Sequence, residues 1–293
     1  MNTTVIEVES TSKIRHYIAL LKFRLSATVV FSGTFGYLMA IEHTVEWYKL
    51  ALFILGSFSI TGSANIINQI IEKDIDKLMK RTKDRPLPTS ALSVQDAILF
   101  ASILGIIGTA TLALFFNAVT AGFALLSLIL YAFVYTPLKQ INPISVLVGA
   151  FPGALPPLIG WVAITGQVSV EALVLFAIQF VWQFPHFWAI AWLGDEDYKK
   201  AGLKMLPSSG KSIQTSSQIA LYTMLLLPLG MLPKYLEMTG NVSIWITSIC
   251  SIIFLWQTIV LVFQGTNKAA LRIMFASFFY LPIVQIAFLL DKI

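Results

Sequence analysis

The sequence predicts an all-α fold, a polytopic membrane bundle of nine transmembrane helices. Of its 293 residues, 57% are apolar and only 12% are charged, whereas soluble domains are about 45–50% apolar and about 25% charged. Nine apolar stretches are long enough, or nearly so, to cross the roughly 30 Å hydrocarbon core of a bilayer. Each stretch should be helical, because an open strand edge would leave backbone groups unpaired in lipid.

The apolar stretches divide the chain into a short polar segment and one membrane domain. We expect a polar cytoplasmic N-terminal segment at 1–23 and the membrane domain at 24–293. The polar start has no apolar region followed by a small-residue cleavage site, so we expect no cleaved signal peptide. Only Phe116 and Asn117 separate the third stretch from the fourth, which predicts a tight hairpin. The stretches lie at residues 24–42, 49–71, 96–115, 118–136, 143–163, 169–193, 216–236, 241–263 and 270–290.

The basic residues predict the direction in which each span crosses the membrane. With the N-terminus in the cytoplasm and the spans alternating, the outer loops hold only Lys49, Lys234 and Lys292 of the 20 lysines and arginines. This asymmetry follows the positive-inside rule and predicts a cytoplasmic N-terminus and an external C-terminus. The net charge of +5 therefore reflects topology, and it gives no reason to expect a nucleic-acid partner.

Three polar residues with helical spacing end the second stretch. Asn68, Glu72 and Asp76 stand at positions i, i+4 and i+8. Each step of four residues turns a helix by about 40° net, so the three side chains share one face over roughly 12 Å. An amide and two carboxylates are hard oxygen ligands, which suit Mg²⁺ bound together with substrate phosphates and water. The segment 77–88, rich in Lys and Arg, follows at once and would attract those phosphates.

A second acidic cluster ends the sixth stretch. Asp195, Glu196 and Asp197 are followed by several lysines, and the alternation of spans brings both clusters to the cytoplasmic side. The simpler alternative is that both are solvated helix ends beside anionic lipid headgroups. Two observations favour a site. The same pattern occurs twice, and Asn68 extends the first cluster into an apolar stretch, where polar groups are costly.

The residues around the first cluster carry a family resemblance. The segment NQIIEKDID (68–76) resembles the first motif of the UbiA superfamily of intramembrane prenyltransferases, N-x-x-x-D-x-x-x-D, with Glu in the middle position. Further strings, spread over about half of the chain, resemble the branch of that superfamily that farnesylates haem. These strings are DIDKLMKRTKDRPLP (74–88), YTPLKQINP (135–143), GAFPGALPPLIGW (149–161), WQFPHFWAIAW (182–192) and DYKKAGLKMLP (197–207).

The second motif of the superfamily is not matched in full. That motif is often D-x-x-x-D, and no such pair stands here. Asp197 occupies the family's D-Y position, and Gly194 stands where relatives often have a basic residue. Which of Asp195, Glu196 and Asp197 would reach a metal therefore stays open.

The resemblance implies a fold, a reaction and a set of site residues. It implies helices around a central cavity that opens near the cytoplasmic face, in the cytoplasmic membrane of a bacterium. It implies farnesyl transfer from Mg²⁺-bound farnesyl diphosphate to a vinyl group of haem B. The product would be haem O for terminal oxidases, with haem A synthase or an oxidase assembly factor as a partner. The implied catalytic metal ligands are Asn68, Glu72, Asp76 and Asp197. The residues implied to contact the diphosphate or the haem propionates are Arg81, Arg85, Lys139, Lys200 and Lys204.

His186 is the histidine expected at membrane depth. Asp197 follows eleven residues later, which on a continuous helix places the two on one face about 16 Å apart. Haem iron commonly takes an axial histidine, so a haem contact is expected; the alternative is a bond to a neighbouring helix. Pro185 predicts a kink in this helix. The run GAFPGALPP (149–157) predicts a broken or closely packed fifth helix.

Two other function classes compete with this interpretation. A transporter with acidic coupling sites would need charged residues near the middle of the bilayer, whereas here they gather at one end of the spans. A UbiA-type enzyme that acts on a small aromatic acceptor is the nearer alternative. A comparison of haem B with 4-hydroxybenzoate as acceptors would separate the two enzymes.

Overall fold

Helices are the regular elements throughout the described part of the chain, apart from one isolated bridge between Thr239 and Lys292. The computed structural model describes residues 13–208 and 210–293, so residues 1–12 of the expected N-terminal segment lie outside it. The all-α fold class is confirmed. The elements in chain order are a short helix Lys13–Leu20, α2 (Phe23–Met39), α3 (Trp47–Asp76), α4 (Val94–Phe115), α5 (Ala118–Ile129), the π-helix η1 (Leu130–Tyr135), α6 (Thr136–Ile141), α7 (Ser145–Thr165), α8 (Val170–Leu193), α9 (Asp195–Lys200), α10 (Ile213–Tyr235), α11 (Val242–Gln264) and α12 (Asn267–Leu290).

Each expected membrane stretch coincides with a helix of the bundle. Eight spans are long and apolar enough to cross a membrane, with α5, η1 and α6 counted as one, Ala118–Ile141. The first stretch meets the same test only when α2 is joined to Lys13–Leu20, from which it is bent by 43°. The described residues thus contain eight candidate spans, or nine with this bent pair.

Polar residues at the loop ends fix where several helices begin. The side chain of Asn117 accepts a hydrogen bond from the N–H of Thr120 at 2.8 Å, which starts α5 directly after α4 and makes the expected tight hairpin. Such N-caps satisfy donors that have no partner within the helix. The same arrangement begins other helices at Ser93, Ser169, Ser212 and Thr266.

α7 stays a continuous helix although prolines occupy positions 152, 156 and 157. A proline has no N–H, so the carbonyl group four residues earlier loses its helical partner. Neighbouring helices supply donors. Oγ of Ser127 lies 3.2 Å from the carbonyl oxygen of Pro152, and Nε2 of Gln179 lies 2.8 Å from that of Gly153. α7 is therefore not broken, because α5 and α8 satisfy these free carbonyls.

The backbones of α2 and α7 touch. A Cβ atom on Gly36 would lie 1.9 Å from the carbonyl oxygen of Pro157, and one on Gly160 would lie 2.0 Å from that of Gly33. Glycine permits this approach because it has no side chain, as at other close helix contacts in membranes. Of the two expectations for the fifth membrane helix, close packing is confirmed.

A cluster of neutral polar groups joins α2, α8 and α12 inside the bundle. Nε2 of Gln285 donates to Ser32 Oγ at 2.6 Å and to Gln179 Oε1 at 3.1 Å, and Ser32 also donates to Gln179. All three side chains are buried. Because a polar group in an apolar interior is costly unless it is bonded, these contacts hold the first and last long helices against α8.

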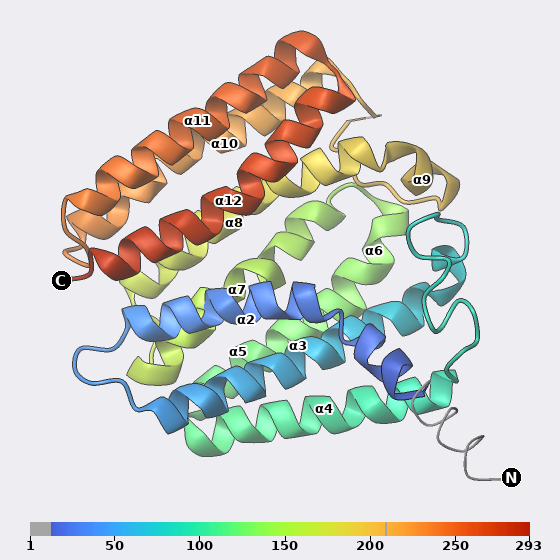
Figure 1. The fold of residues 1–293 in the computed structure, drawn as a ribbon, viewed down its shortest axis with the longest axis horizontal. Helices are drawn as coiled ribbons and strands as arrows, with labels where there is room; N and C mark the ends of the chain where they lie inside the picture. Colours follow the sequence, from blue (N-terminus) through green and yellow to red (C-terminus); the bar gives the residue numbers. More distant parts are fainter. Residues whose placement is uncertain (1–12, 209) are drawn as a thin grey trace, which may run out of the picture.

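The loops gather at two ends of the bundle (Figure 1). At the end nearer α9 lie α9 itself and the loops 77–93, 142–144, 201–208, 210–212 and 265–266. At the opposite end lie the loops 40–46, 116–117, 166–169 and 236–241. We call the first of these the polar end, because it holds both acidic clusters and its segments contain nine of the 20 lysines and arginines, whereas the loops of the opposite end contain none. That the polar end faces the cytoplasm stays a prediction.

Candidate active site

The three polar residues of α3 lie on one buried face at the polar end. Asn68, Glu72 and Asp76 are 2%, 5% and 1% exposed, and Nδ2 of Asn68 donates to Glu72 Oε2 at 2.9 Å. The shared face expected from their spacing is confirmed. A buried carboxylate is costly unless it is paired and hydrogen-bonded. The partners of these groups therefore decide what the cluster can do.

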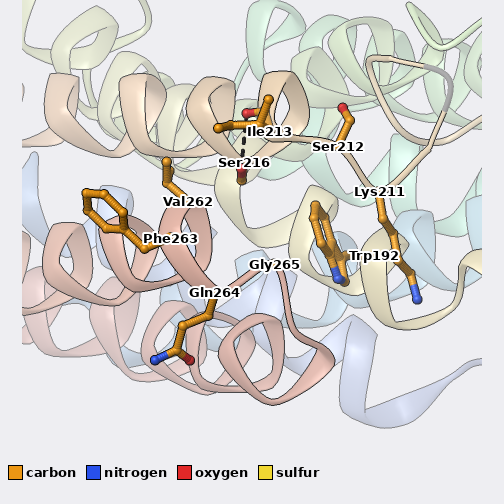
Figure 2. Close-up of a pocket in the computed structure, with 9 residues that line it drawn as sticks. All are labelled: Trp192, Lys211, Ser212, Ile213, Ser216, Val262, Phe263, Gln264 and Gly265. Carbon is orange, nitrogen blue, oxygen red and sulfur yellow. Dashed lines mark hydrogen bonds between the residues drawn. The ribbon is translucent and has the colours of Figure 1, made fainter.

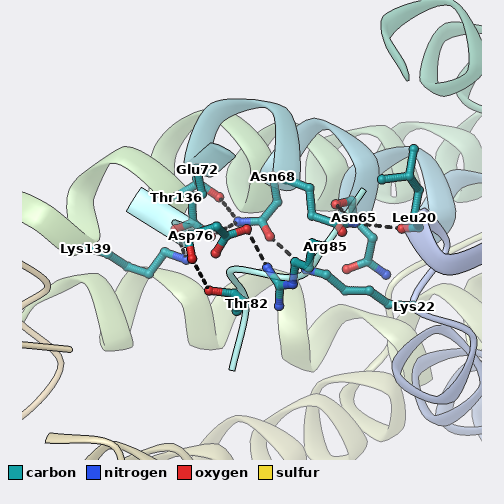
Figure 3. A network of polar contacts seen from close by, with 11 residues as sticks. Leu20, Lys22, Asn65, Asn68, Glu72, Asp76, Thr82, Arg85, Thr136 and Lys139 are labelled. Atoms are coloured by element: carbon teal, nitrogen blue, oxygen red, sulfur yellow. Dashed lines mark hydrogen bonds and ion pairs between the residues drawn. The ribbon is translucent and has the colours of Figure 1, made fainter. Parts of the chain in front are cut away.

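Two cations from different segments pair with the two carboxylates (Figure 3). Lys139 of α6 forms an ion pair with Glu72. Arg85, in the loop after α3, has Nη1 2.7 Å from Oδ2 of Asp76. Both cations are among those that the resemblance implies, and the structure brings both to the cluster. Because each carboxylate has a cation partner, the cluster can remain buried.

Lys22 is a third cation at this cluster, and the residue pattern does not predict it. It lies in the break between Lys13–Leu20 and α2, in the left-handed backbone region with φ 48° and ψ 55°. This conformation is costly for a residue with a side chain. Its ammonium donates to Asn68 Oδ1 at 2.9 Å (Figure 3). The positive-inside rule already accounts for a lysine just before the first span, so the position of Lys22 in the sequence does not mark it as a site residue.

Thr136 ties α3 to the irregular segment before α6. Nδ2 of Asn68 donates to Thr136 Oγ1 at 3.0 Å, and that hydroxyl donates to the carbonyl oxygen of Tyr131 at 2.8 Å. The segment Leu130–Tyr135 is the π-helix η1, an irregularity that often occurs at functional sites. Thr136 belongs to the family-like string 135–143, but its contact with α3 follows from the tertiary fold and has no counterpart in sequence spacing.

The oxygen atoms of the cluster fit a hard divalent cation such as Mg²⁺. Oδ1 of Asp76 is buried and has no hydrogen-bond partner, whereas Oδ2 is held by Arg85. Among the described residues, no three His, Cys, Asp or Glu side chains are grouped so that they could hold a metal by themselves. The protein can thus supply one or two carboxylates. This is the usual share for Mg²⁺ whose other ligands are phosphate and water.

The second acidic cluster lies on a separate short helix. α8 continues through Pro185 and ends at Leu193, and α9 begins at Asp195 after the single residue Gly194. The expectation that Asp197 shares a helical face with the histidine of α8 is wrong, because it assumes one continuous helix. The distance of about 16 Å that follows from that assumption falls with it.

Asp197 lines a pocket at the polar end, beside the loop that follows α3. The pocket holds ≈ 250 Å³, and its border includes Arg81 and Met79 from that loop and Tyr198 from α9. The structure thus brings Arg81 and Asp197 to one place. Among the described residues, it does not group Asp197 with the α3 carboxylates as ligands of one metal.

The two lysines expected to follow the second cluster, Lys200 and Lys204, are exposed. The backbone N–H of Lys204 donates to the carbonyl oxygen of Lys139 at 2.7 Å, and its ammonium lies 3.2 Å from the carbonyl oxygen of Ile141. The segment after α9 is therefore bound to α6, which also carries a cation of the first cluster. The structure shows no contact that separates a diphosphate role from a propionate role for either lysine.

His186 is buried between α8 and α12. Its Nδ1 lies 2.8 Å from Oγ of Ser277. The ring stacks on Trp182, with centroids 4.7 Å apart and planes at 16°, and meets the ring of Phe278 edge-on at 5.0 Å. The expected bond to a neighbouring helix is thus present through Ser277, and the expected haem contact stays a prediction.

Comparison with known proteins gives the same family along nearly the whole chain. Residues 29–281 match the model of the UbiA prenyltransferase family. A protohaem IX farnesyltransferase of Cytophaga hutchinsonii is 54% identical over 283 residues, 96% of this chain and 99% of the relative. A protohaem IX farnesyltransferase of Flavobacterium johnsoniae is 42% identical over 280 residues, 92% of each chain.

Solved structures share the fold. A digeranylgeranylglyceryl phosphate synthase superimposes with a TM-score of 0.80 at 22% identity, over 95% of this chain and 98% of that one. A UbiA homologue from Archaeoglobus fulgidus, bound to DMAPP and Mg²⁺, gives a TM-score of 0.66 at 18% identity, over 93% of this chain and 98% of that one. At these identities the likeness is one of fold alone.

Proposed function

This chain belongs to the UbiA prenyltransferase family, and we propose that it transfers a farnesyl group from farnesyl diphosphate to a vinyl group of haem B, giving haem O. The proposal rests on the sequence identity of 54% and 42%, over nearly the full length of the chain, to two relatives that are named for this activity. The buried cluster of Asn68, Glu72 and Asp76 with its cations supports it. We place the protein, a multi-pass membrane protein, in the bacterial cytoplasmic membrane with its N-terminus inside.

The distribution of buried charge supports an enzyme rather than a transporter. Among the described residues, the buried Asp, Glu, Lys and Arg side chains are Glu72, Asp76 and Lys139, and all three belong to the α3 cluster at the polar end. The buried histidine, His186, is bonded to Ser277. A transporter with acidic coupling sites would need such groups near the middle of the membrane. The deep polar cluster of this bundle is instead made of neutral serine and glutamine side chains.

The cations of the cluster can bind the diphosphate of the donor. Arg85 presents a planar fork that suits phosphate oxygens, and Lys139 and Lys22 add point charges beside it. In the structure Arg85 and Lys139 neutralise Asp76 and Glu72, and Lys22 donates a hydrogen bond to Asn68. On substrate binding they would turn from carboxylate and amide oxygens to phosphate oxygens.

The oxygens released by this exchange are the proposed metal ligands. Asn68, Glu72 and Asp76 would hold Mg²⁺ together with the diphosphate. When bound, Mg²⁺ neutralises negative charge on the leaving group. The cations nearby stabilise the same charge as it develops, which lowers the barrier to breaking the allylic C–O bond.

The apolar interior of the bundle protects the farnesyl cation that forms. While water is excluded, the vinyl group of haem supplies the electron pair for the new C–C bond and becomes a carbocation itself. One water molecule then adds to that carbocation and loses a proton, which gives the hydroxyl group of the product. Arg81 borders the same polar end and is proposed to contact the diphosphate or a propionate, together with Lys200 and Lys204. Asp197, on the border of the same pocket, stays a proposed metal ligand. An interaction with haem A synthase or an oxidase assembly factor stays a prediction.

The proposal is tested with the purified full chain in lipid nanodiscs. Farnesyl diphosphate and Mg²⁺ are supplied with haem B or with 4-hydroxybenzoate, and products are identified by mass spectrometry. Haem O is expected with haem B, and no prenylated product is expected with 4-hydroxybenzoate. Prenylation of 4-hydroxybenzoate without haem O would show that the chain acts on a small aromatic acceptor instead.

A further inference from the structure

Each proposed metal ligand of α3 already has a cation as its partner. The pairs, each of which joins a side chain of α3 to a cation of another segment, are Asn68 with Lys22, Glu72 with Lys139 and Asp76 with Arg85 (Figure 3). The cations come from the break before α2, from the loop after α3 and from α6. Because the proposed function assigns the same side chains to Mg²⁺, a metal ion and these cations compete for them.

The cations are more accessible than the groups that they hold. The side chain of Arg85 is 21% exposed, whereas that of Asp76 is 1% exposed. Lys22 is partly exposed, whereas Asn68 is buried. Oδ1 of Asp76 has no hydrogen-bond partner, but it is buried as well. A ligand that arrives from outside therefore meets positive charge before it meets an oxygen of α3.

The charges of the cluster also disfavour a metal ion that arrives alone. With all of these groups charged, three cations face two carboxylates, so the cluster has an excess of one positive charge. Charges a few ångströms apart interact strongly where water is largely excluded, so this excess repels a divalent cation. A diphosphate carries several negative charges and is attracted for the same reason. Once it has bound, the excess charge is negative and favours a divalent metal.

Two of the cations are held in place by more than their charge. Lys22 lies in the left-handed backbone region with φ 48° and ψ 55°, which a residue with a side chain keeps only when its surroundings hold it there. The bond from its ammonium to Asn68 supplies such a hold. The ammonium of Lys139 also lies 4.8 Å from the centre of the Tyr135 ring, a cation–π contact. The closed arrangement is thus part of the fold.

We propose that Lys22, Arg85 and Lys139 exclude free divalent metal from the site until the diphosphate of the donor has bound. The diphosphate draws the three cations away from the α3 side chains, whose oxygens then become available to a metal. The donor therefore controls when the metal site exists. This inference rests on the proposed function, because it takes a prenyl diphosphate as the donor, but it does not depend on which acceptor is prenylated.

Mn²⁺ binding to the purified full chain in lipid nanodiscs tests this order. Mn²⁺ suits the same oxygen ligands as Mg²⁺, and EPR measures how much of it stays free. The nanodiscs are dialysed against Mn²⁺ with or without farnesyl diphosphate, and without haem so that no transfer occurs. Empty nanodiscs correct for Mn²⁺ held by the donor alone. The wild-type chain should bind Mn²⁺ about 10²-fold more tightly with farnesyl diphosphate, and Mn²⁺ should tighten farnesyl diphosphate binding by the same factor.

Removal of one cation should open the site to metal in the absence of the donor. In Lys22→Gln and Lys139→Gln the excess positive charge is gone, so Mn²⁺ alone should bind at least about tenfold more tightly than it binds to the wild type. Lys211→Gln is the matched control and should leave Mn²⁺ binding unchanged. Lys211 lies at the same end beside a separate pocket of ≈ 220 Å³ (Figure 2), where it is bonded to the neutral side chain of Asn267.

Three outcomes would overturn the proposal. Mn²⁺ binding to the wild-type chain that is equally tight with and without farnesyl diphosphate would show that the cations do not exclude metal. Unchanged Mn²⁺ binding by Lys22→Gln and Lys139→Gln would show that other groups set the order. An equal gain in Lys211→Gln would reveal a general effect of surface charge.

Two features of the design keep the result interpretable. If Lys139→Gln fails to fold because Glu72 is left buried without a cation, Lys22→Gln decides alone, since its partner Asn68 carries no charge. A thermal unfolding curve like that of the wild type identifies the variants that are folded. A chain that shows the expected Mn²⁺ order but forms no haem O would retain this inference and lose the proposed acceptor.

Discussion

The two acidic clusters of the polar end have similar side chains in opposite environments. In the first, Glu72 and Asp76 are buried, and each has a cation from another segment as its partner. In the second, Asp195 pairs with Lys199 four residues later, with side chains 14% and 62% exposed. A surface pair of this kind contributes about 0–1 kcal/mol. A buried pair costs several kcal/mol of desolvation, which only good geometry offsets.

Burial and long-range pairing therefore separate a candidate site from a solvated helix end. The sequence pattern cannot make this distinction, because acids followed by lysines occur in both places. In the first cluster, Oδ1 of Asp76 is also buried and has no hydrogen-bond partner. A solvated helix end has no buried oxygen of this kind. The comparison predicts that substitutions in the first cluster lower the rate of prenyl transfer strongly and that substitutions in the second cluster lower it less.

The comparison depends first on both clusters lying on the same side of the membrane. In a chain with Cys250→Ala, cysteines introduced at Asp84 and Lys211 should react with a membrane-impermeant reagent from the cytoplasmic side and not from outside. Both positions are exposed and lie at the polar end. Thr44→Cys, at the opposite end, should show the reverse. If Asp84 and Lys211 are labelled from opposite sides, the two clusters cannot belong to one site.

Asp76→Asn should have the largest effect on catalysis. The substitution keeps the shape of the side chain and removes the charge that faces Arg85 and the proposed metal. Loss of such a group typically lowers the rate by a factor of about 10²–10³. Haem O formation per purified molecule measures it, with Asp195→Asn as the matched control. Near wild-type turnover of Asp76→Asn would remove this carboxylate from the metal site.

Glu72→Asp should keep part of the activity. Aspartate is the usual residue of the family motif at this position, so the carboxylate remains, but it is drawn back by one methylene from Lys139. A displacement of about 1 Å in a reacting site can cost up to about 10²-fold, so we expect a rate about 10–10²-fold below wild type. Glu72→Gln should fall further. If the two variants have equal rates, the charge at this position does not matter.

Asp197→Asn should reduce turnover about tenfold, less than Asp76→Asn. Asp197 is only partly buried, and solvent screens its interactions. The test compares the Mg²⁺ dependence of the two variants. A loss as large as that of Asp76→Asn, together with a raised Mg²⁺ requirement, would place Asp197 among the metal ligands. Unchanged turnover would assign this aspartate to the solvated end of α9.

His186→Ala should give the smallest change in the reaction. If the ring contacts haem, haem B binding weakens about tenfold and the spectrum of the bound haem changes, while the KM for farnesyl diphosphate stays the same. Ser277→Ala is the control, because it removes the partner of His186 and leaves the ring. Equal losses for both substrates, with a drop of about 1–3 kcal/mol in stability, would show that His186 only joins α8 to α12.

The sequence predicts those features of the candidate site that arise within one helix. The contacts between helices depend on tertiary packing. The face shared by Asn68 and Asp76 follows from the repeat of one helix. The contacts of Asn68 with Lys22 and Thr136 join residues 46 and 68 positions apart, and spacing within one element carries no signal of them. The assumed continuity between His186 and Asp197 fails at the single residue Gly194, where the helix turns aside.

The contact of α2 with α7 has a consequence for how the protein is made. α2 has only 17 residues, and its backbone rests on α7 through Gly36 and Gly160. A chain is synthesised from its N-terminus, so α2 must enter the bilayer long before its principal neighbour exists. The hydrogen-bond partners of Ser32, Gln179 of α8 and Gln285 of α12, are made later still. α2 is thus made well before the helices that hold it in place, so its stable insertion depends on segments that emerge much later.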